Sequence, residues 1–267
     1  MNGSQVVLEA RNMAKRFGAV VALADASLSL NRHEVLGLVG DNGAGKSTLL
    51  KILSGVLPAD TGAIHLEGRE IQIRRPHDAL EAGIETVYQD LALVDTMSAH
   101  QNVYLGREEL SKAWLPRFLN LVDDRTMRKR SREVLDALAV KVPSINVSVK
   151  GMSGGQRQCL AIARAILWGR RIVILDEPTA ALGVRESEQV LDVIRDLRNH
   201  KVSVIVVSHN MQQLMTIADR ITVMRLGRTI ATRVVKQTQV SEIVGLITGA
   251  IGADPERETK LVTNPAA

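Results

Sequence analysis

Three segments of the chain are runs of apolar residues with at most one polar position, and the stretches between them carry apolar residues at helical spacing. The runs are Val35–Val39, Ile172–Leu175 and Val202–Val207. Strands buried on both faces have this composition, which is typical of a parallel sheet covered by helices. The stripe formed by Val190, Val193 and Ile194 predicts one of the crossover helices that parallel strands require. We therefore expect an α/β fold with a mostly parallel sheet.

Shorter segments near the N-terminus predict a small antiparallel β subdomain beside this core. Residues 6–9 and 27–30 have the composition of short strands, and Leu66–Ile73 that of a hairpin that turns at Glu67–Gly68. Residues 91 to about 168 show helical spacing and no strong strand signal, so we expect them to form an inserted helical subdomain.

The whole pattern predicts one folded domain over residues 1–250 and a polar tail over 251–267, where two prolines occur. Apolar residues make up 45% of the 267-residue chain and aromatic residues 2%, so aliphatic side chains must build the core. No apolar run approaches the roughly 18 residues that span a bilayer, and the first residues lack the apolar stretch of a secretory signal. The single cysteine, Cys159, fits a reducing cytosol.

The net charge of +5 allows a nucleic acid or an anionic membrane as partner. The densest basic stretch, residues 125–132, also carries the start of an apolar stripe that continues through Val134, Leu135 and Leu138. This spacing predicts an amphipathic helix with its basic residues on the outer face. A solvated face explains the charges, and contact with lipid headgroups or a partner stays open.

A candidate phosphate-binding loop follows the first apolar run directly. The segment Gly40-Asp41-Asn42-Gly43-Ala44-Gly45-Lys46-Ser47-Thr48 fits the pattern G-x-x-x-x-G-K-[ST]. Its glycines let several backbone N–H groups point at one anion, and a helix that begins near Lys46 adds its positive dipole. Lys46 is placed to reach the β- and γ-phosphates, and the Ser47 hydroxyl to bind Mg²⁺. The sequence therefore predicts a nucleoside triphosphate and Mg²⁺ as ligands.

A pair of acidic residues ends the second apolar run. In a nucleoside triphosphatase, Asp176 at the strand end would hold Mg²⁺. Glu177, the next residue, would be placed to polarise the attacking water. An acidic corner between strand and loop is the alternative, and the phosphate-loop pattern in the same chain favours the catalytic interpretation.

The segment Gly151–Gln158 resembles the signature of ATP-binding cassette proteins, LSGGQ, with Met152 in place of leucine. Independently of the family, Ser153 is a good helix N-cap, and the turn Ser153-Gly154-Gly155-Gln156 forms a second candidate anion site. The resemblance implies a P-loop NTPase core that binds and hydrolyses ATP. It also implies a head-to-tail homodimer, in which each ATP lies between one chain's phosphate loop and the other chain's signature.

Three further residues match family motifs in order and spacing. Gln89 resembles the Q-loop glutamine that contacts Mg²⁺ or water, and His209 the switch histidine that contacts the γ-phosphate. Phe17 stands where the family commonly has a tyrosine that stacks on adenine. Gly183 departs from the pattern, because the family usually has an aspartate there and glycine offers no carboxylate across the dimer.

Finer details resemble ATPases that import simple sugars such as ribose, xylose or fructose, on the segments Lys15–Val20, Asp41–Thr48 and Glu85–Asp90. The resemblance implies transmembrane permease subunits, indirect work with a secreted or periplasmic sugar-binding protein, and a peripheral location on the cytoplasmic face of the cell membrane. The alternatives are the ATPase of an exporter, and a soluble cassette ATPase acting on nucleic acid or ribosomes. We expect no nucleic acid partner, because tandem cassettes and long coiled-coil insertions are not seen here.

Overall fold

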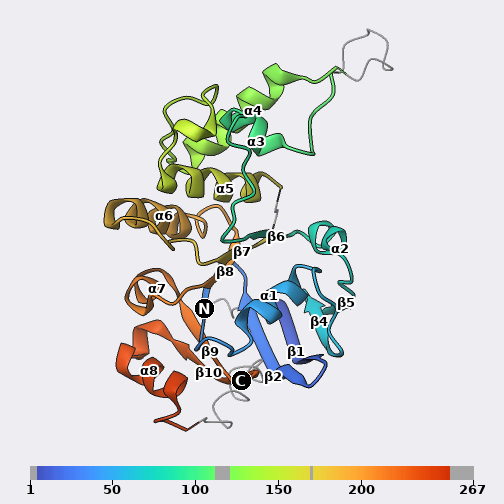
Figure 1. Ribbon diagram of the computed structural model, residues 1–267, viewed down its shortest axis with the longest axis vertical. Coiled ribbons are helices and arrows are strands. Elements are labelled where there is room, and N and C mark those ends of the chain that lie inside the picture. The colour runs from blue at the N-terminus through green and yellow to red at the C-terminus, as the bar shows by residue number, and fades with distance from the viewer. Residues whose placement is uncertain (1–4, 112–120, 169–170, 253–267) are drawn as a thin grey trace.

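The computed structural model describes residues 5–111, 121–168 and 171–252. Within these ranges, ten strands form one continuous sheet in the order β5-β4-β1-β2-β10-β9-β3-β8-β7-β6 (Figure 1). The strands are β1 (Val6–Phe17), β2 (Val20–Asn31), β3 (Val35–Val39), β4 (Thr61–Leu66), β5 (Arg69–Ile71), β6 (Ile84–Val87), β7 (Ile172–Asp176), β8 (Ser203–Val207), β9 (Arg220–Arg225) and β10 (Arg228–Val234). The α-helices are α1 (Lys46–Leu53), α2 (Pro76–Glu81), α3 (Ala99–Tyr104), α4 (Asp124–Ala137), α5 (Gly154–Trp168), α6 (Val184–Asp196), α7 (Met211–Ile217) and α8 (Val240–Thr248).

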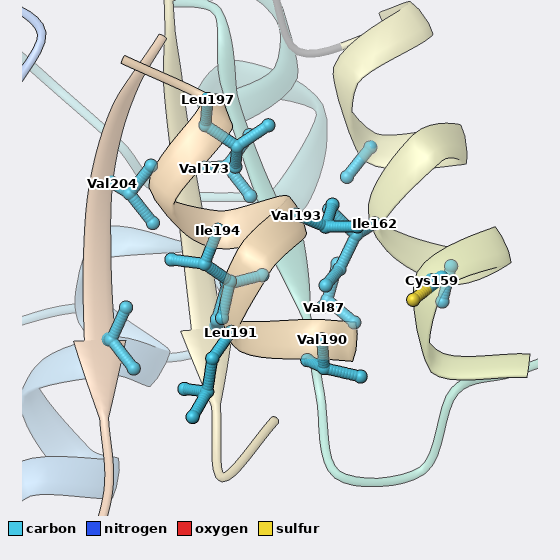
Figure 2. Packing of buried hydrophobic residues seen from close by; sticks show 14 of the residues in the cluster. Val87, Cys159, Ile162, Val173, Val190, Leu191, Val193, Ile194, Leu197 and Val204 are labelled. Carbon is cyan, nitrogen blue, oxygen red and sulfur yellow. The ribbon is translucent and has the colours of Figure 1, made fainter. Parts of the chain in front are cut away.

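The strands β9, β3, β8, β7 and β6 run parallel to one another, as the apolar runs predicted. Two cores explain why those runs are almost entirely apolar. Val173 and Leu175 of β7 belong to the cluster that contains α5 and α6 (Figure 2), whereas Ile172 and Ile174 belong to the cluster around α1. All four side chains of Ile172–Leu175 are buried, so no polar position interrupts that run.

The antiparallel half of the sheet is larger than the sequence indicated. β1 and β2 each have 12 residues, whereas the expected strands covered only 6–9 and 27–30. Irregular register between these two strands breaks the simple alternation that signals a strand. The turn at Glu67–Gly68 is confirmed, since both residues have the left-handed φ that a tight hairpin needs. A parallel bridge from Arg228 to Asp25 joins this half to the rest of the sheet.

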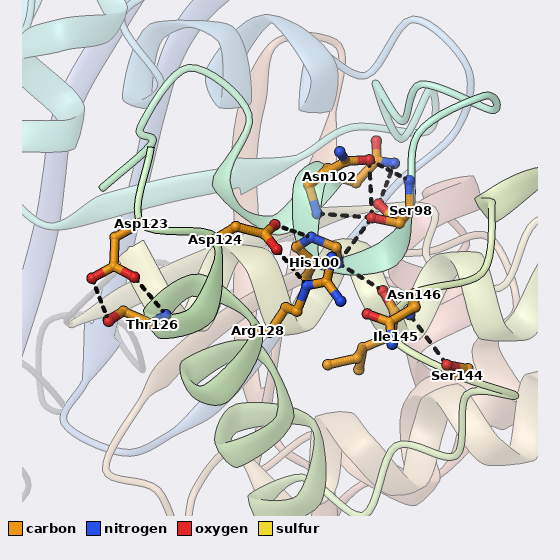
Figure 3. A network of polar contacts seen from close by, with 11 residues as sticks. Ser98, His100, Asn102, Asp123, Asp124, Thr126, Arg128, Ser144, Ile145 and Asn146 are labelled. Atoms are coloured by element: carbon orange, nitrogen blue, oxygen red, sulfur yellow. Dashed lines mark hydrogen bonds and ion pairs between the residues drawn. The ribbon is translucent and has the colours of Figure 1, made fainter. Parts of the chain in front are cut away.

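Helices α3, α4 and α5 stack above the sheet (Figure 1). A buried histidine links the first two, because His100 Nδ1 lies 3.0 Å from the Ile145 carbonyl oxygen and Nε2 lies 2.8 Å from Asp124 Oδ1 (Figure 3). Asn102 donates three hydrogen bonds to carbonyl oxygens of the loop before α3 and at its start. Polar contacts therefore hold this part of the molecule together beside its apolar core.

The expected amphipathic helix is α4, which buries Met127 and Leu135. Its basic residues form ion pairs on the surface: Arg128 with Asp124 at 2.6 Å, and Arg130 with Glu109. Of the helices in the described ranges, none combines the length and the apolar composition needed to cross a bilayer. Residues 253–267 of the expected tail lie outside the described residues.

Candidate functional site

Strand register brings the separate sequence motifs to one edge of the sheet. Leu38 of β3 lies opposite Val207 of β8, and Val207 lies opposite Asp176 of β7. These parallel strands end side by side, so the segments that follow them meet at the same edge. Next along, Val87 of β6 pairs with Leu175, which places the segment containing Gln89 beside the acidic pair. Such an edge is where open α/β sheets bind ligands.

The phosphate loop is a tight turn between β3 and α1. Gly40 has φ 154°, and a Cβ there would lie 2.2 Å from the Met224 carbonyl oxygen, so a side chain would collide with β9. Gly45 has φ 99°, and a Cβ there would lie 2.6 Å from Leu23 Cδ2. No side chain caps the start of α1, so the N–H groups of its first turn face the loop without a side-chain acceptor. These are the features of an anion cradle at a helix N-terminus.

Lys46 lies buried across the mouth of this cradle. Its Nζ donates hydrogen bonds to the carbonyl oxygens of Gly40 at 2.7 Å and Asp41 at 3.0 Å. Burial lowers the pKa of Lys46, and the charges of Glu177, Asp41 and Asp176 oppose that effect. The cation is thus held among acidic groups at the edge of the sheet, where a phosphate would compete for it.

The two carboxylates differ in their surroundings. Burial raises the pKa of Asp176 at the end of β7, and the charges of Lys46, Lys51 and His209 act against it. Glu177 has a left-handed φ of 52°, and its N–H donates to the Val207 carbonyl oxygen at 3.0 Å. That backbone contact turns the side chain toward the loop after β8.

Glu177 and His209 form a close pair that the sequence did not indicate. His209 Nε2 lies 3.2 Å from Glu177 Oε1. Burial raises the pKa of Glu177, and the charge of His209 opposes the shift. Glu177 was expected to polarise the attacking water and His209 to contact the γ-phosphate, but their mutual contact depends on the pairing of β7 with β8.

Gln89 and Phe17 lie at the borders of this edge. Gln89 is exposed in the loop after β6. Phe17 ends β1 and is half exposed, with Lys15 Nζ 5.8 Å from the centre of its ring. β2, which pairs with β1, touches the phosphate loop through Leu23. The hairpin that carries Phe17 therefore contacts the phosphate loop through β2.

The signature segment forms a separate turn at the start of α5. The Ser153 N–H donates to Gln156 Oε1 at 3.0 Å, and the Gln156 N–H donates to Ser153 Oγ at 3.4 Å. This reciprocal capping box orients the first turn of the helix. Among the described residues, no hydrogen bond joins the turn to the phosphate loop of the same chain. The signature turn and the phosphate loop are thus two separate candidate anion sites.

Two residues at these turns were missed in the sequence. Gly227 donates its N–H to the Ala44 carbonyl oxygen at 3.1 Å and so holds the phosphate loop against the β9–β10 turn. Glu186, in the first turn of α6, accepts a hydrogen bond from the Gly183 N–H at 3.3 Å. An acidic residue near the start of a helix is a common capping pattern, so the sequence could have indicated the capping role of Glu186. Its contact with the signature turn, a segment 30 residues earlier, has no signal in the sequence.

Comparisons with known proteins agree on one family. The model of the ABC transporter family matches residues 23–180. The chain is 44% identical to the fructose import ATP-binding protein FrcA of Rhizobium meliloti, over 94% of this chain and 96% of that protein. It is 41% identical to the xylose/arabinose import ATP-binding protein XylG of Sulfolobus acidocaldarius, over 91% of this chain and 94% of that protein.

Two further comparisons concern length and fold. The ribose import ATP-binding protein RbsA of Chromobacterium violaceum is 37% identical over 93% of this chain, which covers 48% of that protein. A nucleotide-free ATP-binding cassette from an ABC transporter has the same fold, with a TM-score of 0.76 at 23% identity, over 97% of this chain and 100% of that one. With a family model that matches more than half of its length and relatives this similar along nearly all of it, the chain belongs to the ABC transporter family.

Proposed function

We propose that this chain is the ATP-hydrolysing subunit that energises import of a small sugar through a separate membrane permease. Membership in the ABC transporter family supports ATP binding and hydrolysis. The names of its relatives, which import fructose, xylose or arabinose, and ribose, support sugar import. The observation that carries the proposal is the edge where β3, β7 and β8 end, because it unites a phosphate cradle with a lysine, two carboxylates and a histidine.

The nucleotide would lie with its phosphates in the cradle of Gly40–Thr48 and its adenine against the ring of Phe17. Ser47, Asp176 and Gln89 would hold Mg²⁺. Hydroxyl, carboxylate and amide oxygens are the hard donors that this ion prefers, and all three residues belong to the same edge of the sheet. Mg²⁺ bound there would neutralise charge on the β- and γ-phosphates.

Three side chains of the chain itself would act on the attacking water and on the phosphates. Glu177 would accept a proton from the attacking water, and its raised pKa makes it a better base than an exposed carboxylate. His209, 3.2 Å from Glu177, would orient that carboxylate and contact the γ-phosphate. Lys46 would leave its two carbonyl partners for the β- and γ-phosphates, since an anion offers it a stronger, charge-assisted hydrogen bond.

A second copy of the chain would complete the site. The turn Ser153-Gly154-Gly155-Gln156 is a second anion-binding turn apart from the first, so two chains arranged head to tail would enclose each ATP between unlike turns. The helical part around residues 91–120 would contact the permease on the cytoplasmic face of the membrane. The permease would receive its sugar from a secreted or periplasmic binding protein.

Sugar uptake in the native host tests this function. The chromosomal gene is replaced by the wild-type chain, by Glu177→Gln, or by Glu188→Gln, an exposed residue of α6 with the same charge change. We expect Glu177→Gln to abolish uptake of one radiolabelled sugar among fructose, ribose, xylose and arabinose, with Glu188→Gln at the wild-type rate. Unchanged uptake of all four sugars in the Glu177→Gln strain would refute the proposal.

A further inference from the structure

The carboxylate of Glu186 lies against the signature turn of its own chain. A Cβ on Gly155 would be 2.9 Å from Glu186 Cβ, so the two residues are in close contact. Hydrogen bonds from the Ser153 hydroxyl and from the N–H groups of Gly183 and Gly155 hold the pKa of Glu186 below its ordinary value. One oxygen of this carboxylate, Oε2, accepts the Gly183 N–H at 3.3 Å and lies 3.8 Å from where a Cβ on Gly154 would be. A negatively charged side chain therefore lies at the signature turn.

We propose that Glu186 is an internal anion that occupies the signature turn, and that the phosphate of a partner chain's nucleotide must displace it. The inference rests on the proposed function, in which this turn receives that phosphate. The carboxylate of Glu186 lies beside Gly154 and Gly155, at the N-terminus of α5 where the phosphate would bind. The two anions therefore compete for the same end of the helix.

Repulsion between the two negative charges adds to this competition. The N-terminus of α5 favours one negative group through its dipole and free N–H groups. A second anion at the same place would be repelled by the first, because like charges a few ångströms apart destabilise each other. Binding of the phosphate therefore requires Glu186 to move away, and the contact raises the ATP concentration at which two chains associate.

Displacement of Glu186 would also change the contacts of the segment that precedes α6. The same carboxylate accepts the Gly183 N–H at 3.3 Å, and Leu182 Cδ2 lies 2.8 Å from where a Cβ on Gly154 would be. Gly183 itself has no side chain that could contact the nucleotide. Glu186, three residues later, is the group that connects this segment to the signature turn.

ATP-driven dimerisation of the whole chain tests the inference. The background is Glu177→Gln, which is expected to retain bound ATP, and mass is followed by light scattering during titration with Mg-free ATP. We expect added Glu186→Gln to lower the ATP concentration for half-maximal dimerisation roughly three- to tenfold, from loss of one charge and its hydrogen bonds at a helix N-terminus. Added Glu188→Gln, with the same charge change on the exposed side of α6, should leave it unchanged.

A second variant and a second measurement separate this role from a structural one. Glu186→Asp keeps the charge but is one methylene shorter, so its carboxylate would lie farther from the signature turn, and we expect a lower threshold here too. Binding of a fluorescent ATP analogue to dilute, monomeric protein should be equal in all variants, because the phosphate loop is untouched.

The outcomes distinguish the two proposals. A dimer that forms at the same or a higher ATP concentration in both Glu186 variants than in the Glu188 control overturns the inference and leaves the proposed function standing. Absence of any ATP-dependent dimer in the Glu177→Gln background overturns the composite site and the inference with it.

Discussion

At the scale of single residues, Lys46 shows how the site combines burial with charge. A buried ammonium is unfavourable, and burial accordingly lowers its pKa. Two carbonyl oxygens and three nearby carboxylates keep it charged. Lys46 thus places a positive charge beside the backbone N–H groups that the phosphate loop offers to an anion.

Lys46→Ala should lose ATP hydrolysis roughly 100-fold or more, the usual worth of a positioned donor to developing charge. Release of phosphate by the purified chain with Mg-ATP measures it. Lys129→Ala is the matched control, because Lys129 lies on the exposed face of α4 in a 3.9 Å pair with Glu133 and has no neighbour at the candidate site. Wild-type hydrolysis by the Lys46 variant would show that the phosphate loop is wrongly assigned.

At the scale of elements, the contact of α5 with α6 depends on glycine. Gly155 begins the buried face of α5, and α6 approaches so closely that a methyl group would meet the Cα of Glu186 at 3.2 Å as well as its Cβ. These are atoms of the backbone or next to it, and they cannot rotate away as the end of a side chain could. The signature glycine therefore serves packing in addition to any contact with phosphate.

Gly155→Ala should destabilise the fold by about 1–3 kcal/mol through overpacking between α5 and α6. Gly151→Ala makes the same chemical change four residues earlier, where the nearest atom to the new methyl would be 3.9 Å away, and its effect should stay within about 0.5 kcal/mol. Denaturant unfolding of the two variants and the wild type measures both values. Equal stability of the two variants would contradict the close approach.

At the scale of the whole molecule, the helical part projects from the sheet (Figure 1). Exposed apolar side chains gather where the chain leaves α3 and returns to α4. They are Leu105, Leu110, Leu121 and Val122. The permease contact expected around residues 91–120 includes part of this region, and residues 112–120 lie outside those described. A permease that docks here would bury apolar surface that water now covers.

Leu105→Asp should reduce recovery of the chain with membranes severalfold in cells that contain the permease, because a carboxylate would be buried in the contact. Val244→Asp on α8 is the control, since Val244 is similarly exposed on a part of the molecule remote from α3. Fractionation of cells with and without the permease measures recovery. If the wild-type chain is recovered equally in both, the docking proposal fails.

Much of the core and the list of candidate site residues were predicted from the sequence, because the responsible features are local. An unbroken run such as Val35–Val39 indicates burial on both faces, and the phosphate-loop pattern requires only neighbouring residues. The strands β6, β9 and β10 were missed, since their polar residues hide the periodic signal and pairing with neighbours makes them strands.

Local patterns by themselves determined which turns of this protein are candidate anion sites. Only the tertiary structure decided how those turns are connected. His209 meets Glu177 through the register of β7 and β8, and Glu186 reaches Gly155 through the packing of α6 on α5. In each case the two residues are about 30 positions apart in sequence, so no repeat or spacing encodes the contact. It follows from the burial of the helices and strands that carry them.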